Sequence, residues 1–101
     1  MTLSPNPRSG GDPAIRVVSG HLELRGRSLP LLSGEVQYWR TDPAAWPRVL
    51  DAVVELGLPI VSTYLSWRRH EPQEGRLRWG ADDPSLDLRR FLGLCAERDL
   101  L

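Results

Sequence analysis

Strand-like and helix-like segments alternate along the chain, and this alternation restricts the possible folds more than any other feature. Apolar residues recur at helical spacing over 43–56. The next segment, 59–65, is β-branched and apolar, which is typical of a strand buried in a parallel sheet. A second amphipathic helix is expected over 85–98. Strands that alternate with helices predict an α/β fold of parallel βαβ units with right-handed crossovers.

The ends of the two helices carry sequence signals. Asp42 is a predicted N-cap, with Pro43 at the first helical position. Pro47 leaves open a later start near Trp46, and Gly57 is a predicted stop. The buried face of the first helix is expected to hold Trp46, Val49, Leu50 and Val53. The second helix is expected to begin at a Ser85 cap and to bury Leu88, Phe91, Leu92 and Cys95.

The region before the first helix resembles β structure. Ser19-Gly20 and Arg25-Gly26 are predicted turns that separate short strands. A further strand is expected over 29–36, with an apolar centre at Leu31-Leu32. Gly34 interrupts that strand and indicates a bulge or a close approach of the backbone. We therefore expect a β-hairpin ahead of the βαβ units.

Composition excludes several classes of protein. The 101 residues include 13 basic and 13 acidic side chains. This zero net charge argues against a nucleic-acid-binding protein and against a polybasic membrane contact. The single cysteine, Cys95, excludes a disulfide framework and a multi-cysteine metal site, and we expect it to be buried and unreactive. The sequence has no glycine-rich phosphate loop and no metal-ligand spacing, so no cofactor and no metal are expected.

The first 13 residues form a separate segment, rich in Pro, Gly and Ser and without periodicity. This composition predicts a disordered tail over 1–13, followed by one domain over 14–101. The tail lacks the apolar core of a secretory signal, and the sequence has no apolar run of about 20 residues. We therefore expect a cytoplasmic protein.

Polar and aromatic side chains gather where the two predicted parallel strands end. One cluster covers 35–40 and the other covers 66–72. In parallel α/β folds, ligands bind at the carboxyl ends of the strands. Carboxylates and amides can bind sugar hydroxyls, and aromatic rings can cover the apolar face of a sugar. The sequence therefore indicates a carbohydrate site.

Individual residues of these clusters allow more than one interpretation. Glu35 and Glu71 would suit a glycosidase carboxylate pair, which needs carboxyl groups roughly 5 Å or 6.5–9.5 Å apart. We favour a structural role for both, through bonds to backbone or arginine. His70 is more typical of a residue that fixes a loop than of a general acid. Tyr38 would suit ligand binding and core packing equally.

The remaining aromatic and basic side chains are interpreted in the same way. Trp46 and Trp79 are expected in the core, and the roles of Trp39 and Trp67 stay open. The pair Arg68-Arg69 would suit an acidic sugar or a salt bridge to nearby carboxylates, and we favour the salt bridge.

Three motifs in order resemble glycoside hydrolase family 35, the β-galactosidases. The segment 32–40 is similar to the family motif LSGEIHYFR, and 56–64 is similar to LGLNTVSTY. Trp67, His70-Glu71-Pro72 and Gly75 are similar to WNxHEPxxG. The resemblance covers roughly residues 20–101. Family 42 is a related possibility, although it usually lacks the histidine before Glu-Pro.

The resemblance implies a (β/α)8 barrel and retaining hydrolysis of terminal β-galactosides by two glutamates. In the family those glutamates lie on later strands, beyond position 101, so no residue here is assigned as catalytic. The chain is expected to be an incomplete barrel, its first two βα units, and inactive by itself. The resemblance implies that Tyr38 contacts galactose. The residues expected to line or support the site are Glu35, Gln37, Trp67, His70 and Glu71.

Departures from the family pattern leave the substrate open. Gln37 replaces a usual histidine, while Pro59 and Arg68 replace usual asparagines. A stand-alone carbohydrate-binding or partner-docking module is the alternative to a glycosidase fragment, and a gene fragment without a stable fold is a third reading. An incomplete sheet exposes a strand edge, through which the chain would self-associate.

Overall fold

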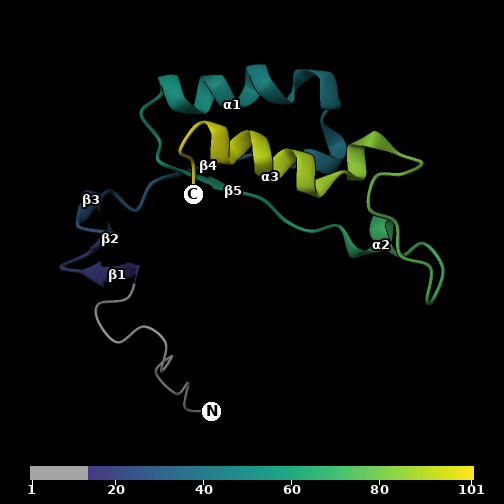
Figure 1. The fold of residues 1–101 in the computed structure, drawn as a ribbon, viewed down its shortest axis with the longest axis horizontal. Coiled ribbons are helices and arrows are strands. Elements are labelled where there is room, and N and C mark those ends of the chain that lie inside the picture. Colours follow the sequence, from purple (N-terminus) through teal and green to yellow (C-terminus); the bar gives the residue numbers. More distant parts are fainter. Residues whose placement is uncertain (1–13) are drawn as a thin grey trace, which may run out of the picture. The chain divides into compact units, whose positions relative to one another are not determined.

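The computed structural model describes residues 14–101, and these form two compact units that divide between Leu31 and Leu32 (Figure 1). The predicted tail over 1–13 lies outside the described residues. Among the helices of residues 14–101, none has the length and apolar character needed to cross a membrane. The described chain forms no closed barrel.

The first unit is a three-stranded antiparallel sheet in the order β1 (Ile15–Val18), β2 (His21–Leu24) and β3 (Arg27–Leu29). Both predicted turns are confirmed. Ser19 and Gly20 have φ values of 49° and 81°, and Arg25 and Gly26 have 49° and 84°. Positive φ at both central residues gives the twist that two-residue hairpins need. The expected hairpin is thus extended by a third strand.

The prediction of one strand over 29–36 is wrong, because the strand structure is interrupted at the centre of this range. β3 ends at Leu29, before Pro30, which has no N–H to donate to a sheet. The next strand, β4 (Ser33–Glu35), belongs to the second unit. Leu31 and Leu32 are exposed rather than forming the apolar centre of a strand.

The second unit contains the predicted βαβ arrangement. β4 pairs in parallel with β5 (Ile60–Ser62), and α1 (Trp46–Glu55) connects them. The end of the chain extends this pairing, because the Leu101 N–H donates to the Pro59 carbonyl (3.0 Å) and the Leu101 carbonyl accepts from the Val61 N–H (2.7 Å). This alternation of donor and acceptor is the parallel pattern.

A core between the two longer helices and the sheet holds this unit together. Figure 1 shows α1 and α3 (Leu88–Glu97) side by side. The core cluster combines buried residues of both helices, of the chain after β4 and of the chain after α3, namely Val36, Tyr38, Trp46, Leu50, Val53, Phe91, Cys95 and Leu100. Burial of Trp46 and Cys95 is confirmed. Leu92, predicted to be buried, is 54% exposed, because α3 packs through Phe91 and Cys95 instead.

Caps define where the helices begin. Asp42 accepts the Ala44 N–H (3.0 Å), as predicted, but it caps a 3-10 turn (Pro43–Ala45), and the α-helix begins later, at Trp46. Ser85 is not the cap of α3. Asp87 caps that helix by accepting the Arg90 N–H (3.0 Å). A short carboxylate reaches an N–H three residues ahead, as an N-cap must.

The polar cluster over 66–72 contains a short helix, α2 (Trp67–His70). Gly34 is confirmed as a point of close approach, because a Cβ there would lie 3.3 Å from both Val53 Cγ2 and Leu58 Cδ1. The β4 backbone therefore rests directly on the side chains of α1 and the segment that follows it.

Candidate functional site

Gln37 connects the carboxyl ends of the two parallel strands. Its Oε1 accepts the Tyr64 N–H (2.9 Å) and the Thr63 hydroxyl (3.4 Å). Its Nε2 donates to Oε1 of Glu35 (2.8 Å), the last residue of β4. The orientation of the amide is fixed by these partners, because a backbone N–H requires an acceptor and a carboxylate requires a donor. The structure therefore joins Glu35 and Gln37 directly, at the edge where ligands bind in parallel folds.

Aromatic side chains lie around the same strand ends. The Trp39 indole N–H donates to the Tyr64 carbonyl (3.1 Å), so both backbone polar groups of Tyr64 are held by the segment after β4. The Tyr64 side chain is 67% exposed. Sequence reasoning did not single out Tyr64. Its position just after β5 was the available signal, because residues there face the same edge as the polar cluster after β4.

Tyr38 and His70 form a buried hydrogen-bonded pair. Both side chains have no exposed surface, and Tyr38 Oη lies 2.7 Å from His70 Nε2. His70 Nδ1 lies 2.7 Å from the Arg78 carbonyl, which can only accept, so Nδ1 carries the proton and Nε2 accepts from the Tyr38 hydroxyl. Burial raises the pKa of the Tyr38 hydroxyl, because desolvation disfavours the phenolate.

The core position of Tyr38 follows from its neighbours. Its ring centroid lies 5.5 Å from that of Phe91 and 6.4 Å from that of Trp46. The predicted contact of Tyr38 with a sugar stays a prediction. His70 has the loop-fixing role that the sequence favours, since it ties the Arg78 backbone to the core.

Glu71 is held by the loop that follows it. Its Oε1 accepts the Trp67 indole N–H (2.8 Å), and its Oε2 accepts the Gly75 N–H (3.0 Å). Both carboxylate oxygens thus stabilise the turn between α2 and the next segment. This arrangement agrees with the structural interpretation of Glu71, through a backbone bond.

Trp67 and Trp79 lie against each other at the surface. Their ring centroids are 6.5 Å apart, and the Trp79 ring lies 4.4 Å from that of His70. Trp67 is 52% exposed and Trp79 is 48% exposed. The prediction that Trp79 belongs to the core is therefore wrong, because its ring covers His70 with one side and leaves the rest exposed.

The two adjacent arginines after Trp67 differ in their partners. Arg69 forms an ion pair with Asp83 (3.3 Å), as favoured from the sequence. Arg68 makes no ion pair within residues 14–101. The Ser85 hydroxyl, which donates to Asp83 (2.6 Å), is the main cause that lowers the pKa of the Asp83 carboxyl, and Arg69 adds to the effect.

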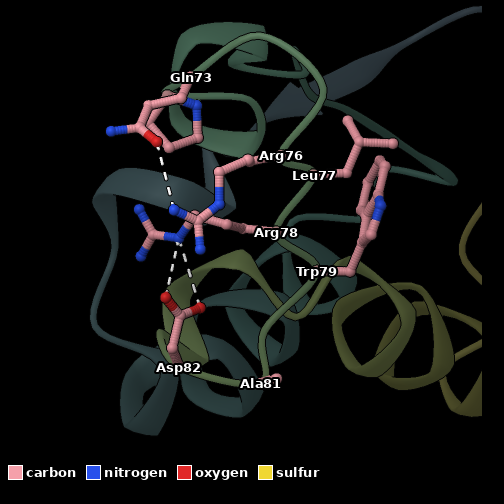
Figure 2. Close-up of a pocket in the computed structure, with 8 residues that line it drawn as sticks. Gln73, Arg76, Leu77, Arg78, Trp79, Ala81 and Asp82 are labelled. Atoms are coloured by element: carbon pink, nitrogen blue, oxygen red, sulfur yellow. Dashed lines mark hydrogen bonds and ion pairs between the residues drawn. The ribbon is translucent and has the colours of Figure 1, made fainter.

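A cavity of about 550 Å³ lies in the segment 72–82 (Figure 2). Figure 2 shows Gln73, Arg76, Arg78 and Asp82 gathered on one side, with Leu77 and Trp79 together on another. Arg78 is paired with Asp82 (3.1 Å), and Arg76 donates to Gln73 (3.3 Å). Of the two strand-end clusters, only Pro72 lines this cavity. Within the described chain, no group of three His, Cys, Asp or Glu side chains suits a metal ion.

A parallel βαβ unit with carboxylate, amide and aromatic groups at its strand ends is typical of α/β enzymes that act on small polar ligands. Comparison with known proteins identifies the family. Residues 21–101 match the model of the family described as glycosyl hydrolases family 35. The chain therefore belongs to glycosyl hydrolases family 35, a glycosidase family, and this match decides against family 42.

Individual relatives agree with this family. The chain is 39% identical over 71 residues to a beta-1,2-glucosyltransferase of Ignavibacterium album, which covers 69% of this chain and 10% of the relative. It is 30% identical over 79 residues to beta-galactosidase 8 of Arabidopsis thaliana, covering 78% of the chain and 9% of the relative. It is 33% identical over 79 residues to a probable beta-galactosidase 2 of Dictyostelium discoideum, covering 78% and 10%. The chain thus spans about a tenth of the length of these relatives.

Proposed function

We propose that this chain supplies the first two strand ends of the sugar site in a retaining glycoside hydrolase that acts on terminal β-galactosides. The observation that carries the proposal is the family match over 21–101, together with the Glu35–Gln37–Tyr64 contacts at the ends of β4 and β5. In a barrel of this kind, substrate binds at the carboxyl ends of the strands. The proposed fold of the whole domain is a (β/α)8 barrel.

Tyr38 is the proposed galactose contact within this chain. Because the Tyr38 O–H donates a hydrogen bond to His70, the Tyr38 oxygen can only accept a hydrogen bond from a sugar hydroxyl. The side chain has no exposed surface in the described chain, so a sugar reaches this oxygen only after neighbouring side chains move. His70 then serves to hold the phenol in one orientation.

The proposed chemistry needs two carboxyl groups on opposite sides of the glycosidic bond. Glu71 does not suit this task, since hydrogen bonds occupy both of its oxygens. We assign neither the nucleophile nor the acid/base to a residue of this chain. We therefore expect the chain to bind β-galactosides without hydrolysing them.

Glycosyl transfer is the second candidate. It is favoured by the 39% identity to a protein named beta-1,2-glucosyltransferase. Both candidates use the same kind of site, and they differ in the sugar that the site holds and in whether water or a second sugar is the acceptor. A preference of this chain for β-glucosides over β-galactosides would favour the transferase.

Binding to matched sugars tests the proposal. The ¹⁵N-labelled chain is titrated with methyl β-galactoside and, separately, with methyl β-glucoside, while amide resonances are followed by NMR. A parallel assay measures release of 4-nitrophenol from its β-galactoside. We expect saturable binding that is tighter for the galactoside, and no release of nitrophenol. Absence of binding to either sugar would contradict the proposal, and hydrolysis by the chain would place a catalytic carboxylate within it.

The open edge of β4 supports a proposal about self-association. Within the described residues, β4 pairs only with β5, so its other edge presents unpaired backbone groups. We expect a concentration-dependent oligomer in light-scattering measurements. A monomer at all concentrations would contradict this part of the proposal.

A further inference from the structure

The two faces of the β4–β5 sheet differ in character. Gly34 and Val61 are paired in register and face the helices, since a Cβ at Gly34 would lie 3.3 Å from Val53 Cγ2 and Val61 packs on the core cluster. Side chains alternate along a strand, so the residues on either side of this pair face away from the helices. Those residues are Ser33, Glu35, Ile60 and Ser62.

This second face is polar. Ser33, Glu35 and Ser62 are exposed, and Glu35 lies directly opposite Ser62 in the register. A strand that is packed on both faces usually carries a continuous apolar run. Three polar positions out of four therefore indicate that this face meets water or a polar ligand, rather than an apolar layer.

Glu35 is held by a hydrogen bond but has no ion-pair partner within residues 14–101. Gln37 donates to its Oε1, while its Oε2 accepts no hydrogen bond and no cation lies in ion-pair distance within residues 14–101. The other carboxylate of the candidate site, Glu71, has both oxygens occupied. Glu35 thus keeps one carboxylate oxygen as an acceptor for a ligand.

Gln37 adds a donor beside this acceptor. Its Oε1 is occupied by the Tyr64 N–H, and only one of the two N–H groups of Nε2 is used, for Glu35. A free carboxylate oxygen next to a free amide N–H matches two neighbouring hydroxyl groups, of which one donates and the other accepts. The exposed Tyr64, tied to the same amide through its backbone, adds an aromatic surface at these strand ends.

We propose that Glu35 and Gln37 form a diol-binding pair that selects the substrate sugar by the configuration of two adjacent hydroxyls. This inference rests on the proposed function and names the residues that set its specificity. The family motif LSGEIHYFR has histidine where this chain has Gln37. A neutral imidazole offers one acceptor and one donor, so a histidine with the same two partners would keep no N–H for a ligand. We therefore expect the sugar preference of this chain to differ from that of relatives that carry the histidine.

Deoxy sugars and one conservative substitution test the pair. Binding of methyl β-galactoside and of its 2-, 3-, 4- and 6-deoxy forms is measured by NMR titration for the unmodified chain and for Glu35→Gln. Glu35→Gln keeps the shape and removes the charge. Glu74→Gln is the matched control, because Glu74 is exposed and makes no hydrogen bond or ion pair in the described chain. Thermal unfolding of each variant confirms that it is folded.

The expected result has two parts. Glu35→Gln weakens binding of the parent glycoside about tenfold, as loss of a charge-assisted hydrogen bond does, and Glu74→Gln leaves it unchanged. Removal of one particular hydroxyl from the sugar weakens its binding to the unmodified chain, but the same removal changes its binding to Glu35→Gln little. A merely structural role for Glu35 would weaken all deoxy sugars equally.

The failures of the two proposals are distinguishable. One outcome is that the unmodified chain binds the galactoside and that Glu35→Gln binds every sugar of the series as tightly as the unmodified chain does. In that case the diol-binding pair is overturned and the proposed function stands. Equal weakening for every deoxy sugar also overturns the pair. If the unmodified chain binds no glycoside, both proposals are overturned. Gln37→Ala provides a second variant, and it should weaken binding at least as much as Glu35→Gln, because it removes the donor and releases Glu35.

Discussion

Replacement of Tyr38 by phenylalanine is the perturbation with the clearest expected effect. The change removes only the hydroxyl and keeps the ring that packs against Trp46 and Phe91. The hydroxyl donates to His70 Nε2 at 2.7 Å, and both side chains are fully buried. In the variant, Nε2 remains buried without a donor, while Nδ1 is still held by the Arg78 carbonyl.

The size of the effect follows from that unpaired nitrogen. A buried polar group left without its partner costs about 1–3 kcal/mol. For a domain of this size, each 1 kcal/mol lowers the melting temperature by roughly 4–8 °C. We therefore expect Tyr38→Phe to melt at least about 4 °C below the unmodified chain. Tyr64→Phe is the matched control, because Tyr64 is 67% exposed and its hydroxyl has no partner in the described chain, so it should change stability by less than about 0.5 kcal/mol.

Urea unfolding followed by circular dichroism measures both variants. A double variant, Tyr38→Phe with His70→Leu, separates the hydrogen bond from other losses, and the two sites should couple by about 0.5–3 kcal/mol. Equal stability of Tyr38→Phe and Tyr64→Phe, or simple additivity of the Tyr38 and His70 substitutions, would contradict a stabilising hydrogen bond between Tyr38 and His70.

Two other perturbations probe the same unit. Because burial holds the pKa of Tyr38 above its ordinary value of 10.0, the native state keeps this proton longer than the unfolded state. The contribution of Tyr38 to the free energy of unfolding is complete below pH 10 and falls above it by at most about 1.4 kcal/mol per pH unit. Urea unfolding between pH 8 and 11 should therefore show a steeper loss of stability for the unmodified chain than for Tyr38→Phe. Parallel losses of stability would contradict this prediction. Gly80 has φ +104°, and a Cβ there would lie 2.7 Å from Asp87 Cβ and 2.8 Å from Asp87 Cα. Gly80→Ala should therefore destabilise the chain by more than about 2 kcal/mol in thermal unfolding. Gly93 lies in α3 with open space around it, so Gly93→Ala should stabilise the chain by about 0.5–1 kcal/mol. Equal effects of the two substitutions would contradict a steric clash at Gly80.

Local patterns in the sequence predicted the frame of the second unit. The apolar face of α1 is correct for Trp46, Leu50 and Val53 because a 3.6-residue period leaves one arrangement in which all of them are buried. The same period wrongly predicts that Leu92 is buried. The apolar stripe of α3 is wider than the surface it packs on, and only the partner helix determines which edge of the stripe is covered.

Competing local signals explain the other differences. Leu31-Leu32 looked like the centre of a strand, but Pro30 removes a donor and the boundary between the two units falls there. Three candidate caps lie within five residues at the start of α3, and which of them caps the helix depends on which carboxylate reaches the right N–H. Asp83 caps the preceding 3-10 turn, Asp87 caps the helix, and Ser85 bonds to Asp83.

For the candidate site, the sequence indicated which residues follow the strand ends, Tyr64 excepted, but not how these residues contact one another. The strand-end rule identified Glu35, Gln37 and His70, because those positions follow from topology. The bond between Tyr38 and His70 joins residues 32 positions apart. The contact between Gln37 and Tyr64 joins residues 27 positions apart. Neither is visible in a local pattern, since each depends on how α1 sets β4 beside β5.

The most direct test of the proposed sugar site locates the sugar on the chain. Amide chemical shifts of the ¹⁵N-labelled protein are measured during titration with methyl β-galactoside. We expect saturating shifts at the strand ends, over residues 35–40 and 63–67. Shifts confined to the cavity over 72–82, or none at all, would contradict it.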